Sequence, residues 1–198
     1  MSAQELILAS KSASRRAMLD AAGIAYEAIP ADIDERAIEA ALVDASPPEV
    51  AEALSVAKAA ALAAHHPGRL VLGSDSLVVV DGRRFDKPAS RDEAAEHLRV
   101  FSGKPLELHS AAALVRDNTC LWSAPSRALL HVRDLSDAFI EHYLAREWPA
   151  VGYTVGVFRI EAMGVQLFEA IEGDQFTILG MPLLPLLEAL REEGVLLS

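Results

Sequence analysis

The 198-residue sequence contains one cysteine, Cys120, so no disulfide can form within the chain. A chain without disulfides suits a reducing compartment such as the cytoplasm. No uninterrupted apolar run approaches the ~18 residues of a membrane span, and the run Leu6–Ala9, after the polar Met1–Glu5, is shorter than the ~7–15 residue core of a secretion signal. These absences favour a cytoplasmic protein without a membrane partner.

Positive charge is also scarce in this chain. There are 18 Lys+Arg against 29 Asp+Glu, which gives a net charge of −11. Nucleic acid and anionic membranes repel such a protein, so neither is expected as a partner. With 52% hydrophobic residues, the composition is typical of a globular protein, and the length predicts a single domain over residues 1–198.

Short apolar runs alternate with helical patterns along the chain, which predicts an α/β fold. Strands are expected at 6–9, 26–29, 70–72, 77–80, 106–115 and 121–132, and helices at 15–22, 49–65, from 90, 136–146 and 183–193. The polar residues Gly73–Ser76 predict a break between two of the strands. Asp81–Gly82 predicts a tight turn, and Asp32–Glu35 an acidic loop.

Several common catalytic motifs are missing. The chain has neither the glycine pattern of a P-loop nor a G-x-G-x-x-G, so neither standard nucleotide fingerprint applies. Its histidines form no H-E-x-x-H and have no cysteine partners, which argues against a zinc site. The absence of G-x-S-x-G argues against a serine hydrolase of the α/β type.

The segment Ser10–Arg16 carries three serines, one lysine and two arginines between a predicted strand and a predicted helix. Helix N-termini at the ends of strands bind anions, so this segment is a candidate phosphate site. A serine-rich helix cap with solvated arginines is the alternative interpretation.

Two acidic positions are candidates for catalysis or metal binding. Asp75 follows a strongly apolar strand, where a carboxylate could bind a metal or deprotonate water; an Asx turn is the alternative. The acidic stretch Asp32–Glu35 offers hard oxygen ligands for Mg²⁺ or Mn²⁺, although such a stretch is ordinary in an acidic protein.

Lysine is rare among the cations, since only four of the 18 are lysines: Lys11, Lys58, Lys87 and Lys104. A compact ammonium group binds phosphate as a point charge. Three of the four lysines lie at or near polar motifs, so phosphate binding is expected of them, against the alternative of a general bias towards arginine.

Together, these motifs resemble the ordered signature of Maf-like nucleotide pyrophosphatases. The matching segments cover essentially the whole chain: Leu8–Arg16, Asp32–Glu35, Lys58–Ala59, Gly73–Ser76, Lys87–Pro88, Glu172–Asp174 and Leu179–Leu183. Each segment is short, but their order and spacing together are specific.

The resemblance implies a two-lobed mixed-sheet α/β fold, similar to that of ITPases, with a central substrate cleft. It also implies hydrolysis of a nucleoside triphosphate to the monophosphate and pyrophosphate with a divalent cation, Mg²⁺, Mn²⁺ or Co²⁺. The family positions carried over to this sequence are the catalytic Asp75, Lys58 and Lys87, the phosphate-binding Ser10, Ser12 and Arg15, and the metal-binding Glu35 and Asp75.

Three further positions separate two branches of the family, one acting on dTTP and UTP and one on 7-methyl-GTP. They are Ser14, Ser76 and Glu161 here, where the first branch has Arg, Thr and Gln and the second Trp, Gln and Glu. A carboxylate offers only acceptors, which complement the N1–H and 2-amino donors of guanine. Glu161 therefore favours a guanine-type base such as 7-methylguanine, whereas Ser14 and Ser76 match neither branch.

Other functions stay open at this stage. They are a dTTP/UTP or broad-specificity pyrophosphatase, a nucleotide-binding regulator of division without turnover, and a phosphatase based on Asp32 and Asp34 alone. The favoured interpretation is an enzyme that clears modified nucleotides, as a monomer or a homodimer. The net charge of −11 does not exclude a polyanionic substrate, because cations gathered in one cleft can bind it.

Overall fold

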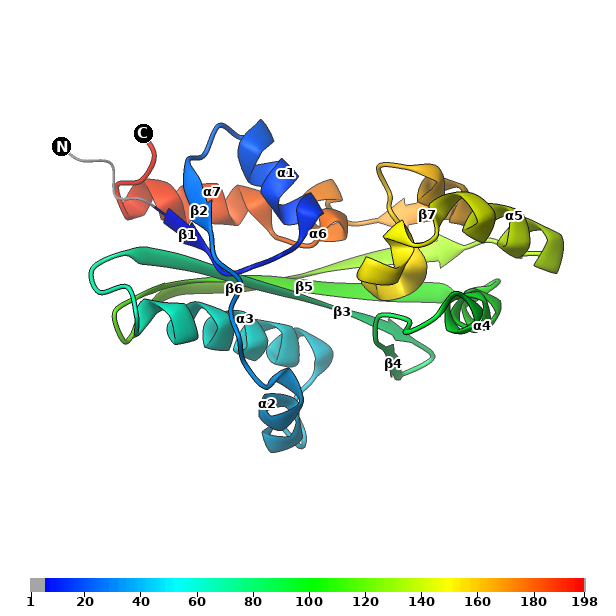
Figure 1. The fold of residues 1–198 in the computed structure, drawn as a ribbon, viewed down its shortest axis with the longest axis horizontal. Helices are drawn as coiled ribbons and strands as arrows, with labels where there is room; N and C mark the ends of the chain where they lie inside the picture. Colours follow the sequence, from blue (N-terminus) through cyan, green and yellow to red (C-terminus); the bar gives the residue numbers. More distant parts are fainter. Residues whose placement is uncertain (1–5, 198) are drawn as a thin grey trace. The chain divides into compact units, whose positions relative to one another are not determined.

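The computed structural model describes residues 6–197, so the polar stretch 1–5 lies outside the described residues (Figure 1). The strands are β1 (Leu6–Leu8), β2 (Tyr26–Ala28), β3 (Leu70–Val80), β4 (Arg83–Phe85), β5 (Pro105–Arg116), β6 (Thr119–Val132) and β7 (Phe168–Glu172). The helices are α1 (Ala13–Ala21), α2 (Glu35–Ala41), α3 (Pro47–Ala63), α4 (Arg91–Phe101), α5 (Asp137–Glu147), α6 (Gln175–Leu179) and α7 (Leu183–Glu192). Short 3-10 helices are η1 (Ala150–Tyr153), η2 (Val155–Val157) and η3 (Met163–Leu167). Over residues 6–197, no helix is both long and apolar enough to span a membrane.

The strands form one mixed sheet. Its order is β2-β1-β3-β5-β6-β7, and β4 pairs with β3 outside this path. β1 is parallel to β2 and β3, whereas β4 and β7 are antiparallel to their neighbours β3 and β6. The prediction of an α/β fold with a mixed sheet is therefore confirmed.

The chain divides into two compact units. Among the described residues, the first comprises 6–76, 109–126 and 174–197, and the second comprises 77–108 and 127–173. Three of the four boundaries fall within β3, β5 and β6, so these long strands contribute residues to both units, and the fourth falls between β7 and α6.

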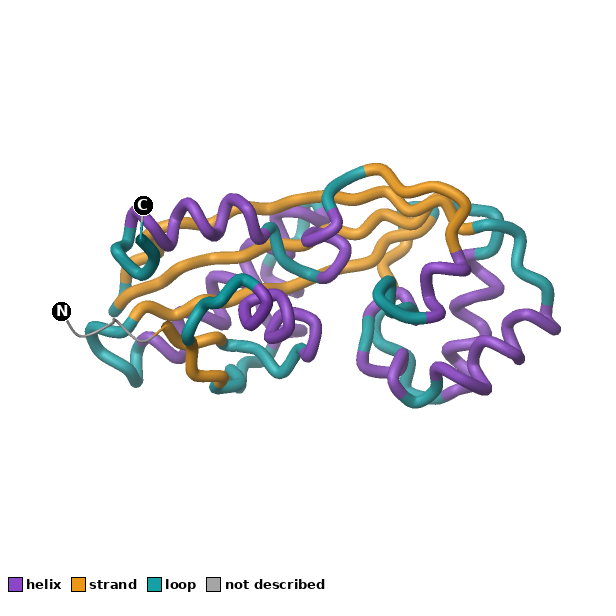
Figure 2. The backbone as a smooth tube through the Cα atoms, turned by 90° about the horizontal axis from the view of Figure 1, so that it is seen from above, coloured by secondary structure: helices purple, strands orange, loops and turns teal. Residues whose placement is uncertain are grey.

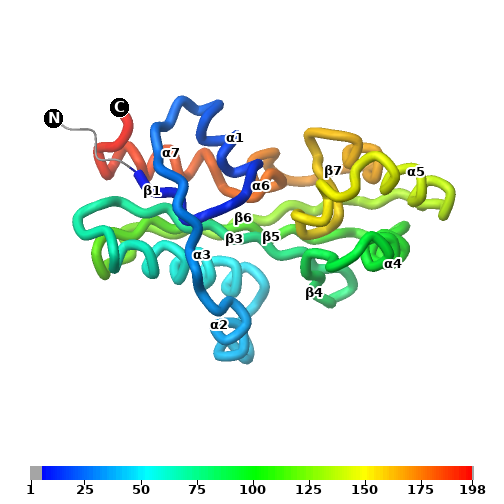
Figure 3. The backbone as a smooth tube through the Cα atoms, viewed as in Figure 1, coloured from blue at the N-terminus to red at the C-terminus, as the bar shows by residue number. Residues whose placement is uncertain are grey.

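In the first unit, β1 alternates its side chains between two cores. Leu6 and Leu8 pack with residues of α1 and α7 on one face of the sheet, and Ile7 packs with α3 on the other. Figure 3 shows helix α7 beside β1 and α1, although α7 is far from both in the sequence. The result is helices on both faces of the strands, as a buried parallel pair requires.

The predicted break in the strand at Gly73–Ser76 is wrong, because β3 runs without interruption from Leu70 to Val80. Polar residues can lie in this buried strand since their hydroxyls are satisfied: Ser74 Oγ donates to the carbonyls of Ala111 and Gly180, at 2.7 and 3.1 Å. Gly73 stays extended and allows a helix to approach closely. Asp75 therefore lies inside a strand and not at the end of one.

The acidic stretch is only partly a loop. Glu35 begins helix α2, and Asp34 caps it by accepting a hydrogen bond from the Ala37 backbone N–H at 3.0 Å. No helix is predicted here from the sequence, because α2 is a single short run without a buried residue. Starting the helix at Glu35 fixes the backbone that carries this carboxylate.

Helices α4 and α5 and the 3-10 turns form most of the second unit beside its strands. Figure 2 shows these helices gathered together in purple. The predicted turn at Asp81–Gly82 is confirmed, since both residues have positive φ, 51° and 73°, and join β3 to β4. Lys87 follows β4 in the loop that leads to α4.

A buried histidine in this unit makes stability depend on pH. His97 of α4 is 8% exposed and packs against Phe85 and Phe101, with ring centroids 5.1 and 5.9 Å away. Burial lowers the pKa of His97, an effect that Glu93 opposes. The unfolded chain therefore takes up a proton at a higher pH than the folded chain. This contribution to stability is complete above the ordinary histidine pKa of about 6.5 and is lost as the pH falls below it.

We expect His97→Phe to make the melting temperature less sensitive to acid. Between about pH 7.5 and about pH 5.5 the melting temperature should fall less in the variant than in the unaltered protein. Calorimetry over that range measures the difference. His65→Gln, at an exposed histidine, serves as the matched control and should keep the full pH dependence. Equal slopes for all three proteins would contradict the assignment to His97.

Candidate active site

The site is built around Asp75, which is buried at 7% exposure. Alternation along β3 places Val71, Gly73 and Asp75 on the face that packs against α3. A Cβ on Gly73 would collide with the carbonyl oxygen of Ser55 in α3, so only glycine permits this close approach. The approach brings Lys58 of α3 to Asp75.

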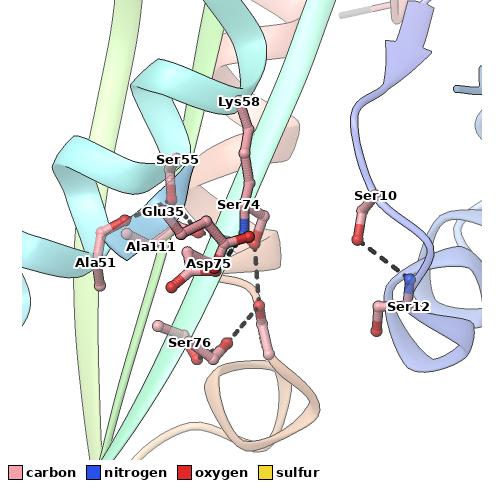
Figure 4. A network of polar contacts seen from close by, with 12 residues as sticks. Ser10, Ser12, Glu35, Ala51, Ser55, Lys58, Ser74, Asp75, Ser76 and Ala111 are labelled. Atoms are coloured by element: carbon pink, nitrogen blue, oxygen red, sulfur yellow. Dashed lines mark hydrogen bonds and ion pairs between the residues drawn. The ribbon is translucent and has the colours of Figure 1, made fainter. Parts of the chain in front are cut away.

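Lys58 joins two carboxylates from different parts of the first unit (Figure 4). Its Nζ lies 2.5 Å from Asp75 Oδ1 and 2.9 Å from Glu35 Oε1. The side chains of Lys58 and Asp75 are 12% and 11% exposed, whereas that of Glu35 is 46% exposed. This Lys58–Asp75–Glu35 cluster combines one positive with two negative charges, and Glu35 is its solvent-facing member.

The serine segment caps helix α1, but the alternative interpretation is wrong in one part, because Arg15 is buried and not solvated. Ser12 is the N-cap residue, and its Oγ accepts a hydrogen bond from the Arg15 backbone N–H at 3.4 Å. Ser14 Oγ lies 2.9 Å from Ser12 Oγ, and Ser10 Oγ accepts from the Ser12 N–H at 3.2 Å. This cap leaves the segment at the positive end of a helix, so capping and anion binding are compatible.

Arg15 turns inward from the same segment and is buried at 9% exposure. Its guanidinium donates to Ser10 Oγ at 3.2 Å, to the Ser74 carbonyl at 2.8 Å, to Ser76 Oγ at 2.9 Å and to the Gly180 carbonyl at 2.9 Å. Burial lowers the pKa of Arg15, and the negative charges of Asp75 and Glu35 oppose that shift.

The predicted site residues are thus divided between the units. The structure brings eight of them together in the first: Ser10, Ser12, Ser14, Arg15, Glu35, Lys58, Asp75 and Ser76. Lys87 and Glu161 belong to the second unit, where both are exposed. Glu161 follows Arg159, whose guanidinium is paired with the buried Glu147 at 2.8 Å.

The Lys58–Asp75–Glu35 cluster contains two carboxylates that could bind a metal ion. Over residues 6–197, no group of three or more His, Cys, Asp and Glu side chains is arranged to hold a metal ion. Asp75 and Glu35 nevertheless point their oxygens at one cation, the ammonium of Lys58. Two hard oxygen donors that share one position suit Mg²⁺ or Mn²⁺ when the substrate phosphates and water supply the other ligands.

A family model described as Maf-like protein matches residues 5–193 of this chain. The chain belongs to the Maf family. A nucleoside triphosphate pyrophosphatase of Rhodopseudomonas palustris (strain HaA2) is 48% identical over 191 residues, covering 96% of this chain and 95% of that protein. A 7-methyl-GTP pyrophosphatase of Rhizobium meliloti (strain 1021) is 49% identical over 193 residues, covering 96% and 97%. Among solved structures, a HAM1 protein from Coxiella burnetii aligns at 18% identity with a TM-score of 0.44, over 65% of this chain and 72% of that one.

Some residues that support the site in this Maf-family chain have no recognisable pattern in the sequence. Ser110 Oγ lies 2.9 Å from Ser76 Oγ and donates to the Thr177 carbonyl, also at 2.9 Å. Thr177 in turn donates to Asp174, the N-cap of α6, at 3.1 Å. A single sequence does not mark Ser110, because its partners Ser76 and Thr177 lie 34 and 67 positions away.

Proposed function

We propose that this chain hydrolyses a nucleoside triphosphate to the nucleoside monophosphate and pyrophosphate. Membership of the Maf family and the names of its relatives support this reaction class. The observation that carries the proposal is the buried carboxylate of Asp75, held 2.5 Å from Lys58 with Glu35 beside it.

Asp75 is proposed as the general base. A water oxygen forms a bond to the α-phosphorus while the bond from that phosphorus to the bridging oxygen breaks, and the electron pair leaves on pyrophosphate. Asp75 accepts the proton released by the water. Lys58 fixes the carboxylate through Oδ1, which leaves the orientation of Oδ2 defined for this transfer.

The cations and hydroxyls of the site are proposed to bind the phosphates. Lys58 and Lys87 would offset the charge that develops on the leaving pyrophosphate, which makes their contribution greatest in the transition state. Ser10 and Ser12 would donate hydrogen bonds to phosphate oxygens at the N-terminus of α1.

A divalent cation fits the donor set that Glu35 and Asp75 provide. Their oxygens already share one cationic partner in Lys58, at 2.9 and 2.5 Å. Mg²⁺, Mn²⁺ or Co²⁺ held there would supply further charge neutralisation for the phosphates. The chain itself holds the two carboxylates together, because Glu35 begins α2 and Asp75 lies in the middle of β3.

Product analysis tests the reaction directly. The protein is incubated with a panel of nucleoside triphosphates and Mg²⁺ or Mn²⁺, and phosphate is measured with and without added inorganic pyrophosphatase. Monophosphate with pyrophosphate supports the proposal. Direct release of phosphate would establish a phosphatase instead, and tight binding without products would establish a nucleotide-binding regulator.

We further propose a guanine-type base, such as 7-methylguanine, as the preferred base. Glu161 carries this proposal, since its carboxylate can accept from both the N1–H and the 2-amino group. Ser14 and Ser76 are proposed to contribute to the same choice. The rhizobial relative named 7-methyl-GTP pyrophosphatase supports this assignment.

Glu161→Gln tests the choice of base. An amide offers one donor and one acceptor, so the ratio of kcat/KM for 7-methyl-GTP to that for UTP should fall by about 10- to 100-fold, or 1–3 kcal/mol. Glu169→Gln, at another exposed glutamate of the second unit, is the control and should leave the ratio unchanged. An unaltered ratio in the Glu161 variant refutes its role, whereas a wild type that prefers dTTP or UTP refutes the guanine assignment itself.

A further inference from the structure

The guanidinium of Arg15 is bound by neutral protein groups on several sides. Its four hydrogen bonds end on two backbone carbonyls and two serine hydroxyls, at 2.8–3.2 Å. An arginine side chain has five N–H donors, so at most one stays available for a further partner. A side chain buried at 9% exposure and bound in this way is held in one orientation.

Two of these acceptors flank Asp75 along β3. Arg15 Nη1 donates to the carbonyl of Ser74, immediately before Asp75, and Nη2 donates to the hydroxyl of Ser76, immediately after it. The Ser74 carbonyl needs such a donor because β1 ends at Leu8 and, among the described residues, its pairing with β3 reaches only Leu72. The guanidinium therefore supplies the hydrogen bond that a neighbouring strand would otherwise donate to the Ser74 carbonyl beside Asp75.

The third acceptor ties the same strand to the turn after α6. The Gly180 carbonyl accepts from Arg15 Nε at 2.9 Å, from Ser74 Oγ at 3.1 Å and from Ser76 Oγ at 3.2 Å. Gly180 has φ of 108°, a conformation that favours glycine. Arg15, Ser74, Ser76 and Gly180 therefore form one network around the backbone of Asp75.

We propose that Arg15 is a positioning residue for Asp75, acting through Ser74, Ser76 and Gly180 and not through contact with phosphate. This inference rests on the proposed function, in which Asp75 is the general base, and it changes the role that the sequence motif gives Arg15. Arg15 keeps the two peptide groups beside Asp75 fixed, so that the carboxylate stays aligned with the attacking water. Lysine cannot replace it, because one ammonium cannot reach acceptors arranged around a planar guanidinium.

Arg15→Lys separates positioning from charge. The positive charge is retained, so a phosphate contact would be largely preserved, whereas the network would be lost. We expect kcat to fall about 100-fold, with KM and the dissociation constant of inorganic pyrophosphate changed by less than about threefold. Arg191→Lys, at a surface arginine of α7 paired with Glu188, is the control and should retain the wild-type kcat.

Two outcomes would overturn the inference. One is a kcat within about threefold of wild type in the folded Arg15→Lys protein; the other is a rise of tenfold or more in KM and in the pyrophosphate dissociation constant, with kcat retained. If wild type itself forms no pyrophosphate, the proposed function fails instead, so the two failures are distinguishable.

A milder variant decides the question if Arg15→Lys does not fold. Ser76→Ala removes one acceptor of the guanidinium and one bond to Gly180. We expect kcat to fall about tenfold with each nucleotide of the panel, in addition to any change in the preference between bases. An unchanged kcat in this variant would overturn the positioning role.

Discussion

Replacing Asp75 by asparagine should lower kcat about 1,000-fold, while the nucleotide still binds. Asparagine keeps the size of the side chain and an oxygen that can accept from Lys58, but it cannot take a proton from water. Because Asp75 is buried in β3 and bound to Lys58 at 2.5 Å, its replacement removes the base without opening a cavity. Steady-state kinetics measure the loss, and calorimetry with the best substrate measures binding.

Asp44→Asn provides the matched control, as an exposed aspartate of the same unit. It should match wild type in both kcat and binding. Turnover of Asp75→Asn within about tenfold of wild type would remove Asp75 from the role of base. Loss of binding together with turnover, in a folded variant, would assign Asp75 to substrate binding instead.

Local patterns in the sequence predicted much of the fold. Leu6–Ala9 is strand-like because its residues are all apolar, and three of them form β1. Asp81–Gly82 gives a tight turn because both residues tolerate positive φ. Ser90 and Ser136 cap α4 and α5, each accepting from the backbone N–H three residues later. These features depend on neighbours in the sequence, so a single sequence contains them.

The continuity of β3 and the burial of Arg15 could not be predicted in this way. Gly73–Ser76 has the composition of a turn, but carbonyls of distant segments, Ala111 and Gly180, satisfy its hydroxyls and keep it extended. Arg15 has the pattern of a phosphate ligand, yet its acceptors lie up to 165 positions away in the chain. Tertiary hydrogen bonds decide both cases, and a single sequence does not show them.

Lysine is rare in this chain, and the ion pairs of Lys58 indicate a specific role for this one. Lys58 joins two carboxylates, and its side chain is 12% exposed. A partly buried ammonium with two carboxylates is stabilised by both, and each carboxylate is stabilised by the ammonium. Lys58 would therefore compete for Glu35 and Asp75 with the divalent cation proposed to bind there.

Lys58→Met should consequently change turnover and metal binding in opposite directions. We expect kcat/KM to fall about 100- to 1,000-fold, because one cation that stabilises the transition state is lost. Binding of Mn²⁺ to the nucleotide-free protein should strengthen about 30-fold, since removing a unit positive charge about 4 Å from a divalent cation relieves roughly 2 kcal/mol of repulsion even in water. Titration calorimetry with Mn²⁺ measures the second effect independently of activity.

Lys104→Met is the matched control, because Lys104 lies in the second unit and is paired with Asp81 at 2.8 Å. It should alter neither turnover nor Mn²⁺ affinity. Two results in Lys58→Met would contradict these expectations, one for metal binding and one for turnover. Weaker Mn²⁺ binding would mean that Lys58 holds the carboxylates in place for the metal, whereas full turnover would remove Lys58 from phosphate stabilisation. The expected pair, weaker catalysis with tighter metal binding, would support a divalent cation that shares Glu35 and Asp75 with the ammonium.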